Sequence, residues 1–591
     1  MHFPRQPDAI GGNCGDVSDT FISRFPFLIL AIMNSLQTTI SMAVSGAIMV
    51  MASIPSAAQV HLPNAGSILQ QKKSESRDLD SLQGSPQQED VLKGQPLKQP
   101  QYELKQFQFI GNTKVSSEEL AQLVQPYVGK KVSRLQLEQI AETISAVYRT
   151  HGYGFTSTTF DPAGLEHGNA AFSIVEGKAG KVTISNKSRV NDWLINGPLE
   201  HFYKNPDNTD NLERASLLMA DTPGVSAASP RLSRGAVDGT VDVTMDVQPA
   251  PLVTGYASID NYGSRSSGRA RMSAMVGVNS PFGWGDALRL NISGMPFHTD
   301  GKSTLGGGTY DFPLSNNGLR GGVGYNRLEY RLGGIYAGQF DGTADVYSAY
   351  ASYPIIRQQT TNLYGRLTYN HSIYRDNQVS FENRRHSDAI ALMFYGNYQD
   401  MLFGRNGANR YSATLTHGNL SYDSALFAQQ DQQGSKTAGA YTKAELSLSR
   451  MQQLTSSTYL QGELQGQYAL KNLDGSSRMV MGGPSGVRAF SSDFVSVDSG
   501  VLFRGTAGWR LPLAVPTTVY TFYDAAAGVL RHTPINGMSN NVNLQGAGIG
   551  IDVSYRNVNT SVSLAKRLGG NALGMRDQPK TWIWASLTYV Y

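Results

Sequence analysis

The sequence predicts a mainly β protein in which two small α+β modules precede a 16-strand antiparallel transmembrane β-barrel. Three observations support this fold class. Short segments that alternate apolar and polar residues recur through residues 252–591, and residues 102–251 mix helical and strand patterns. Beyond residue 59 no apolar run is long enough for a transmembrane helix. If this region meets a membrane, it must therefore cross it as a closed barrel.

The composition limits the kind of protein. Of the 591 residues, 16% are charged, 62 are glycine and 29 are tyrosine, which favours β structure over a typical cytosolic enzyme. The formal net charge of +4, from 50 basic and 46 acidic residues, does not indicate nucleic-acid binding. The single cysteine, Cys14, lies near the amino terminus, which excludes disulfide scaffolds and cysteine metal sites from the rest of the chain.

The amino terminus predicts export. An apolar run over 26–34, a second from Met42 to Ile54, and the small residues that follow fit a signal peptide over 1–58, cleaved after Ala58. Translation that begins at Met33 would leave a leader of ordinary length. A membrane-anchoring helix is the alternative, but serines and a proline interrupt the apolar run.

Three regions follow the leader. Residues 59–101 are polar, with a helix predicted over 67–83 and a linker rich in Gln and Pro after it. Residues 102–177 predict the order strand, helix, helix, strand, strand, and residues 178–251 hold a second unit of similar length. These two units are the expected α+β modules.

Residues 252–591 repeat with a period of two. Leu288, Leu290 and Ile292, for example, alternate with Arg289 and Asn291. About 16 such segments fit, at a length that suits transmembrane strands of about 9–11 residues. Alternation alone does not exclude a soluble β-sandwich or β-propeller.

Two further features favour a lipid-facing barrel. Aromatic residues near segment ends are expected to form an interfacial girdle: Tyr369, Tyr395, Tyr398, Tyr441 and Tyr459. The chain ends on WIWASLTYVY, whose alternate apolar residues run from Ile583 to Tyr591. Bacterial outer-membrane barrels commonly close in this way.

Enzymatic signatures are missing from the sequence. The segment GKST (301–304) has Pro296 where a phosphate loop needs glycine, so it is predicted to be a turn. Neither a His-Glu-x-x-His helix nor a Gly-x-Ser-x-Gly elbow occurs, and the ten histidines are scattered. We predict no enzymatic activity and no catalytic, cofactor-binding or metal site.

The segment GGPSGVRAFSSDF (482–494) places an isolated arginine in a glycine-flanked, aromatic-tipped loop. With two modules and a 16-strand barrel, the chain resembles the two-partner secretion transporters of Gram-negative bacteria. Their loop motif, Val-Arg-Gly-Tyr/Phe, is matched after Gly486 by Val487, Arg488, Ala489 and Phe490, with Ala489 in place of the usual glycine. A positive φ at that position would make alanine costly, whereas a negative φ would make the exchange harmless.

The resemblance also implies an organisation. It implies a plug helix and linker over 59–101, periplasmic POTRA domains over 102–177 and 178–251, and a barrel over 252–591. A long extracellular loop, about 471–498, would fold back into the pore. Further segments that resemble the family are DTPGV (221–225), L-x-x-G (232–235) and 258–286.

The segment FYDAAAG, Phe522 to Gly528, is similar to the family strand that supplies an aspartate to the loop arginine. The resemblance therefore implies a latch between Arg488 and Asp524. Independently of it, arginine presents a planar fork that can bind a carboxylate bidentately. The alternative is a solvated loop arginine and an ordinary aspartate that faces the lumen.

The resemblance implies a pore in the Gram-negative outer membrane that exports a large secreted partner of haemolysin, adhesin or contact-dependent toxin type, and assists its activation. The POTRA domains would capture this partner by adding a strand at a sheet edge. The candidate edge comprises Gly154, Phe155, Thr156, Ser157, Thr158, Thr159 and Phe160. We expect a monomer that contacts outer-membrane lipids, with no nucleotide or nucleic acid. A barrel-assembly factor, a passive porin and a soluble adhesive protein are the alternatives.

Overall fold

The computed structural model of the protein describes residues 63–80, 101–161, 168–206, 208–237, 239–264, 266–294, 301–378, 381–534, 539–569 and 579–591. The expected signal peptide over 1–58 lies outside the described residues, as does most of the expected linker. None of the helices in the described ranges combines the length and the apolar character that membrane crossing requires.

The first module is an α+β unit. Its elements are β1 (Gln101–Glu103), β2 (Gln106–Ile110), α3 (Ser117–Val124), β3 (Lys131–Ser133), α4 (Arg134–Thr150), β4 (Ser157–Asp161) and β5 (Asn169–Val175). Strand β5 lies between β2, to which it is parallel, and β4, to which it is antiparallel. Ser116 caps α3, and Ser133 forms a capping box with Gln136 at α4. Both helices pack on an apolar core around Phe172.

The second module repeats this architecture. Its elements are β6 (Lys178–Asn186), α5 (Asp192–Asn196), α6 (Glu200–Lys204), α7 (Thr209–Ala220), β7 (Val225–Arg234) and β8 (Thr240–Pro249). Strand β8 is central, parallel to β6 and antiparallel to β7. Buried Phe202, Met219 and Met245 belong to its core.

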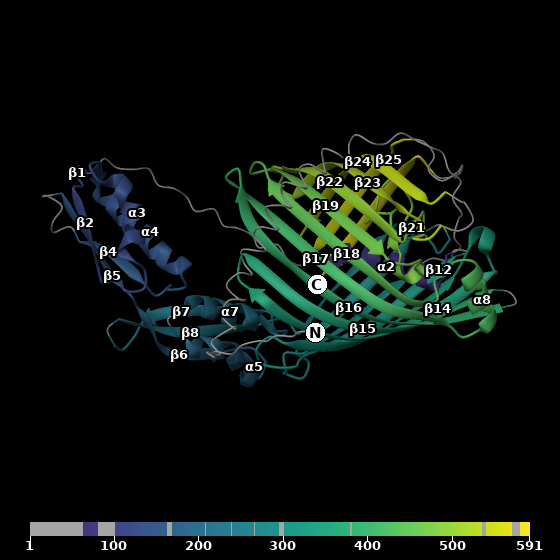
Figure 1. Cartoon of the computed structure of the whole chain (residues 1–591), viewed down its shortest axis with the longest axis horizontal. Helices are drawn as coiled ribbons and strands as arrows, with labels where there is room; N and C mark the ends of the chain where they lie inside the picture. The colour runs from purple at the N-terminus through teal and green to yellow at the C-terminus, as the bar shows by residue number, and fades with distance from the viewer. Residues whose placement is uncertain are drawn as a thin grey trace, which may run out of the picture. The chain divides into compact units, whose positions relative to one another are not determined.

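Sixteen antiparallel strands close into a barrel after the modules (Figure 1). They are β9 (Val253–Asp260), β10 (Arg271–Asn279), β11 (Ala287–Gly294), β12 (Lys302–Pro313), β13 (Arg320–Arg331), β14 (Phe340–Arg357), β15 (Thr361–Gln378), β16 (Phe381–Leu402), β17 (Arg405–Tyr422), β18 (Gly439–Gln453), β19 (Thr458–Ala469), β22 (Ser499–Leu511), β23 (Thr517–Val529), β24 (Asn541–Tyr555), β25 (Val558–Arg567) and β26 (Thr581–Val590). Strand β26 pairs with β9, which closes the cylinder without a free edge. The predicted fold class is confirmed, and the open-sheet alternatives are excluded. One detail differs, because Lys302 to Thr304 of GKST begin β12 rather than form a turn.

The two faces of the barrel strands differ as the period of two predicts. On β11, Leu290 and Ile292 are 50% and 56% exposed on the outer wall. On β26, Ile583 is 58% exposed, whereas its neighbour Trp584 is 2% exposed and points inward. The apolar face is therefore the one available to lipid.

The predicted aromatic girdle is wrong for three of its five members. Tyr369 is an exposed outer residue. Tyr395, however, stacks on Tyr364, and Tyr364 shares the inward face of β15 with Asp376. Tyr441 packs on Leu473 of the internal loop, and Tyr459 shares its strand face with Gln467, which bonds to that loop. The period of two does not show which face turns inward, so nearness to a segment end misplaced these residues.

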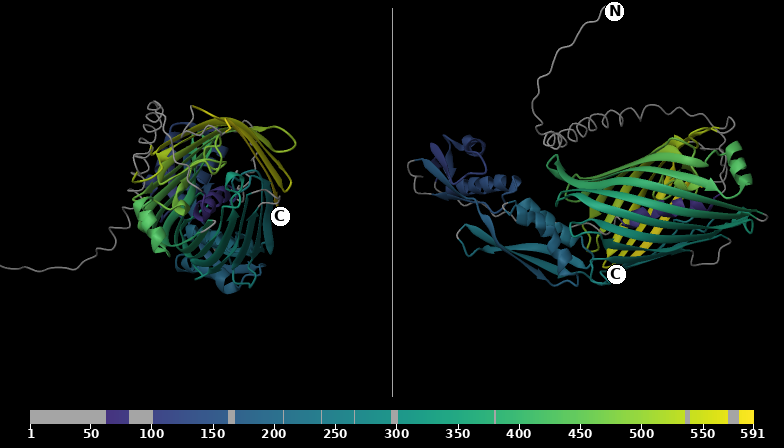
Figure 2. Two further views of the ribbon diagram at one scale, coloured as in Figure 1. Left: turned by 90° about the vertical axis from the view of Figure 1, so that its right-hand side faces the viewer. Right: turned by 60° about the horizontal axis from the view of Figure 1, so that its bottom comes forward.

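Two segments occupy the lumen. The loop after β19 carries the short strands β20 (Met479–Val480) and β21 (Ser496–Val497), which pair with each other. Helix α2 (Ala65–Asp80) lies within the barrel, and both views in Figure 2 show it enclosed by the strands. Its Ile68 and Leu69 are buried against inward residues of β13 and β14. The helix begins two residues before the predicted start, and residues 81–83 lie outside the described ranges. Outside the barrel, the helix α8 (Ala425–Gln433) follows β17.

Candidate functional site

The arginine loop is packed into the barrel through an apolar base. Val487 and Phe490 are buried against inward residues of β23 and β24, such as Leu544. A Cβ at Gly486 would lie 2.4 Å from the carbonyl oxygen of Met481, so this turn requires glycine. The loop tip is thereby held in one place relative to the wall.

Arg488 and Asp524 meet at this tip. Arg488 Nε and Nη2 donate to the two carboxylate oxygens of Asp524 at 2.8 and 2.7 Å, and the backbone N–H of Arg488 donates to the same group at 3.0 Å. The two side chains are 8% and 0% exposed. The bidentate geometry fixes both the position and the orientation of the guanidinium.

Two aromatic residues complete the site. The Arg488 guanidinium lies 3.6 Å from the centre of the Phe522 ring, a cation–π contact that shields it from water. On β26, Trp584 Nε1 donates to the carbonyl oxygen of Arg488 at 2.7 Å. At Gly528, a Cβ would lie 2.6 Å from the Ser499 carbonyl oxygen, so this position favours glycine too. Sequence reasoning found Phe522 and Gly528 but missed Trp584, because only barrel closure brings β26 beside the loop.

Ala489 occupies the family glycine position without backbone strain. It is not among the residues with positive φ, so alanine is tolerated. Its methyl group faces Gly546 on β24, where a Cβ would lie only 2.4 Å from that of Ala489. The extra methyl on the loop is therefore accommodated by the missing side chain on the wall.

A second ion pair holds the base of the loop. Arg478 Nε donates to Asp498 Oδ1 at 3.1 Å, and these side chains are 4% and 0% exposed. The other oxygen of Asp498 accepts the backbone N–H of His532 at 3.0 Å. Nothing in the sequence singled out this pair, because neither residue belongs to a motif.

Helix α2 is fixed at its first turn. Asn64 caps it by accepting the Ser67 N–H at 2.9 Å, and Asp376 of β15 accepts the Ala65 N–H at 2.7 Å. Arg385 bonds to Asp376 and lies 3.1 Å from Asp474 of the loop. Asp376 and Arg385 of the wall therefore connect the first turn of the helix to Asp474 of the loop.

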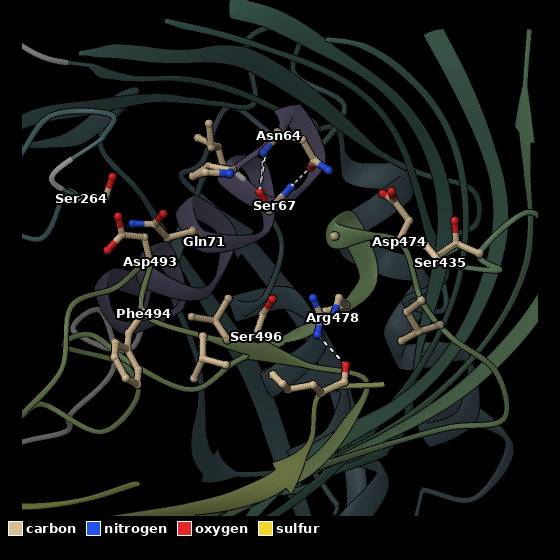
Figure 3. Close-up of a pocket in the computed structure, with 18 of the residues that line it drawn as sticks. Asn64, Ser67, Gln71, Ser264, Ser435, Asp474, Arg478, Asp493, Phe494 and Ser496 are labelled. Atoms are coloured by element: carbon tan, nitrogen blue, oxygen red, sulfur yellow. Dashed lines mark hydrogen bonds between the residues drawn. The ribbon is translucent and has the colours of Figure 1, made fainter. Parts of the chain in front are cut away.

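A polar cavity of about 230 Å³ lies between α2 and the loop (Figure 3). Gln71 of α2 and Arg478 and Asp493 of the loop are among its lining residues. Among the described residues, no group of three His, Cys, Asp or Glu side chains is placed to hold a metal ion. The cavity is thus lined by residues of both internal segments.

The candidate capture edge is partly corrected. Ser157, Thr158, Thr159 and Phe160 belong to β4, an edge strand of the first sheet. Gly154, Phe155 and Thr156 precede β4 in a turn, where Phe155 is 7% exposed and packs in the core of the second module. The Thr158 N–H already donates to Ser145 Oγ at 3.0 Å, so this donor is occupied. The sequence could not show these contacts, which come from α4 and the second module.

The chain matches a model of the "Haemolysin secretion/activation protein ShlB/FhaC/HecB" over residues 239–553, more than half of its length. The protein belongs to this haemolysin secretion/activation family. The model of the ShlB-type POTRA domain also matches residues 102–177. The suspected relationship to the two-partner secretion transporters is confirmed.

Two relatives of the chain align over most of its length. The heme/hemopexin transporter protein HuxB of Haemophilus influenzae is 28% identical over 498 residues, 82% of this chain and 86% of the relative. The outer membrane transporter CdiB of Dickeya dadantii is 22% identical over 491 residues, 79% of this chain and 83% of the relative.

Solved structures share the fold. CdiB from Escherichia coli superposes with a TM-score of 0.65 at 16% identity, over 90% of this chain and all of that one. BamA from Haemophilus ducreyi lacking POTRA domains 1–3 gives a TM-score of 0.51 at 15% identity, over 83% of this chain and all of the other. With the closed barrel, the family places the protein in the outer membrane, with its POTRA domains in the periplasm, as a transporter of secreted partner proteins.

Proposed function

We propose that this transporter moves one large, β-rich secreted protein through its barrel from the periplasm to the cell surface. The observation that carries the proposal is a closed barrel whose lumen holds two segments, α2 and the arginine loop, each bonded to the barrel wall. Both are attached through polar contacts and apolar clusters. Such contacts can be broken and remade, as a gated path requires.

The two segments have different roles in this proposal. Helix α2 is the plug that fills the resting pore and leaves during transport. The pair Arg488–Asp524 is a latch that keeps the loop docked and determines the shape of the open path. Removal of either charge would leave its partner buried and uncompensated, at a cost of about 3–5 kcal/mol.

Capture of the partner occurs at the edge of β4. Its outward backbone groups, apart from the occupied Thr158 N–H, are available to add an extended strand of the partner. Folding of the emerging protein outside the cell would bias movement outward, without a nucleotide. We further propose that the protein is a monomer that contacts outer-membrane lipids and that it has no enzymatic activity, cofactor or nucleic-acid partner.

Export is tested with each candidate secreted protein that a neighbouring gene encodes. Both proteins are produced in a Gram-negative bacterial host, and the amount of the partner in the medium is measured with and without the transporter. Transporter-dependent appearance in the medium supports the proposal. Equal amounts in both cultures contradict it. Insertion of unrelated barrels that depends on this protein would instead support the alternative of a barrel-assembly factor.

Capture is tested separately by photo-crosslinking. A photoreactive amino acid at the exposed Ser157 of β4 should crosslink to the partner, whereas one at the exposed Glu142 on α4 should not. Crosslinks of equal yield at both positions, or none at Ser157, would remove β4 as the capture edge.

A further inference from the structure

The periplasmic half of the lumen carries unpaired positive charge. Asp376 shows which face of β15 points inward, because it bonds to α2, and Arg366 lies on the same face. Strand pairing extends this face around the barrel and places further arginines on it, three of which resemble Arg366 in having no acidic partner within the described part of the chain. The four, here called the lumen arginines, are Arg289, Arg366, Arg410 and Arg510.

The lumen arginines differ from other inward arginines of this half. Arg320 pairs with Asp311, and Arg504 pairs with Glu463. Among the described residues, no acidic side chain forms an ion pair with any of the lumen arginines. Asp552 lies on the same inward face and carries the opposite charge, and its carboxylate accepts a hydrogen bond from the hydroxyl of Ser561 at 2.7 Å. The balance of unpaired groups on this wall is therefore positive.

These arginines are accessible and lie among tyrosines. Arg289, Arg410 and Arg510 are exposed although they face inward, which indicates water around them. The Arg366 guanidinium lies 3.6 Å from the centre of the Tyr350 ring, and that of Arg510 lies 5.6 Å from that of Tyr459. Stacking holds the guanidinium planes at the wall and leaves their N–H groups free for a ligand.

We propose that the lumen arginines bind acidic, extended segments of a polypeptide that enters the barrel from the periplasm. The assignment of this polypeptide as the exported protein rests on the proposed function, whereas the charge preference rests on the wall itself. A confined pore lined with one sign of charge raises the local concentration of opposite charge. Guanidinium groups bind carboxylates through two parallel hydrogen bonds, and several weak sites allow a chain to move on.

The test uses two fluorescent 20-residue peptides, one of alternating Glu and Ser and one of alternating Lys and Ser. Each is titrated with the purified full-length transporter in detergent, and binding is followed by fluorescence anisotropy. The Glu peptide should bind at least about tenfold more tightly than the Lys peptide in low salt. The preference should shrink as salt shortens the range of the field to roughly 10 Å or less.

Two charge-matched variants locate the site. Changing all four lumen arginines to Gln should abolish the preference. The control changes four arginines on the outer face of the barrel to Gln: Arg327, Arg331, Arg375 and Arg384. This control removes the same total charge but leaves the lumen arginines in place, so it should keep the preference. Folding of each variant is checked by the shift in gel mobility on heating.

The outcomes are distinct. Equal affinity for the two peptides, preference for Lys, or a preference that survives in the fourfold lumen variant overturns the proposal. If that variant does not fold, the reversal potential of wild-type channels in a KCl gradient decides, with chloride selectivity expected and potassium selectivity contrary. A peptide preference without export of the partner would refute the proposed function and leave this site in place.

Discussion

Replacing Arg488 with Ala should release the arginine loop from the barrel wall. The substitution removes two side-chain hydrogen bonds of 2.8 and 2.7 Å and the stacking on Phe522, and it leaves the fully buried Asp524 carboxylate with the backbone N–H of residue 488. Loss of one partner of such a pair costs about 3–5 kcal/mol. Since about 1.4 kcal/mol is a factor of ten, the ratio of docked to released loop should fall at least about 100-fold.

A cysteine reporter measures this release. Ser491 in the loop is 1% exposed, and its hydroxyl has no hydrogen-bond partner among the described residues, so Ser491→Cys should not disturb docking. The sequence otherwise holds Cys14, within the expected leader. Whole cells are treated with a membrane-impermeant maleimide, and the labelling rate is compared in wild-type, Arg488→Ala and Asp524→Ala backgrounds.

Both single variants should label much faster than wild type, and the double variant should label at about the rate of either single one, because the pair acts as a unit. The matched control is Arg271→Ala, which breaks a buried arginine–aspartate pair with Asp260 that joins β9 and β10 and lies outside the loop. Labelling that stays slow in both single variants would refute the latch. Fast labelling in the Arg271 control would show that general loss of stability, not loop release, is measured.

Three further changes test contacts of the loop, of α2 and of the first module. Gly546→Ala should destabilise the docked loop by about 1–3 kcal/mol and speed its labelling, because the new methyl would lie 2.4 Å from that of Ala489. Adding Ala489→Gly should restore slow labelling, and the absence of this rescue would contradict the packing. Gly66→Ala should raise the frequency of channel opening in planar bilayers, because the new Cβ would lie 2.8 Å from Ser476 Cβ; unchanged opening would argue against α2 as the plug. Burial acts to raise the pKa of Glu176, but hydrogen bonds to its carboxylate outweigh this and hold the pKa below its ordinary value. The stabilisation from Glu176 is therefore present above the unfolded pKa of about 4.3 and is lost as pH falls through the folded pKa. As pH falls through this range, the protection of first-module amides, corrected for their intrinsic exchange rates, should decrease in wild type but change less in Glu176→Gln, and identical profiles would contradict the assignment.

Much of the architecture could be read from local patterns. A period of two is a direct consequence of strand geometry, so the alternation from residue 252 onward, with no long apolar helix, specified a barrel wall with two different faces. The order strand, helix, helix, strand, strand was predicted for the first module, and Ser116 and Ser133 cap its two helices. The loop residues Arg488 and Asp524 were found through a motif, and the structure brings them together.

Other features depended on which strands become neighbours. Periodicity places Tyr395 and Tyr459 on one face of their strands but does not show whether that face points to the lumen or to lipid. Their place in the lumen could therefore not be predicted. Phe155 was expected to belong to an open edge, and the adjoining module buries it instead.

By itself the sequence determined the order of the modules, the two-sided character of the barrel strands and the identity of the loop arginine, because each depends on residues close together in the chain. Only the tertiary structure decided that Trp584 holds the carbonyl of Arg488 and that Arg385 links Asp376 to Asp474. These partners meet only after the cylinder closes in one register. A shift of one residue would turn each inward side chain toward lipid.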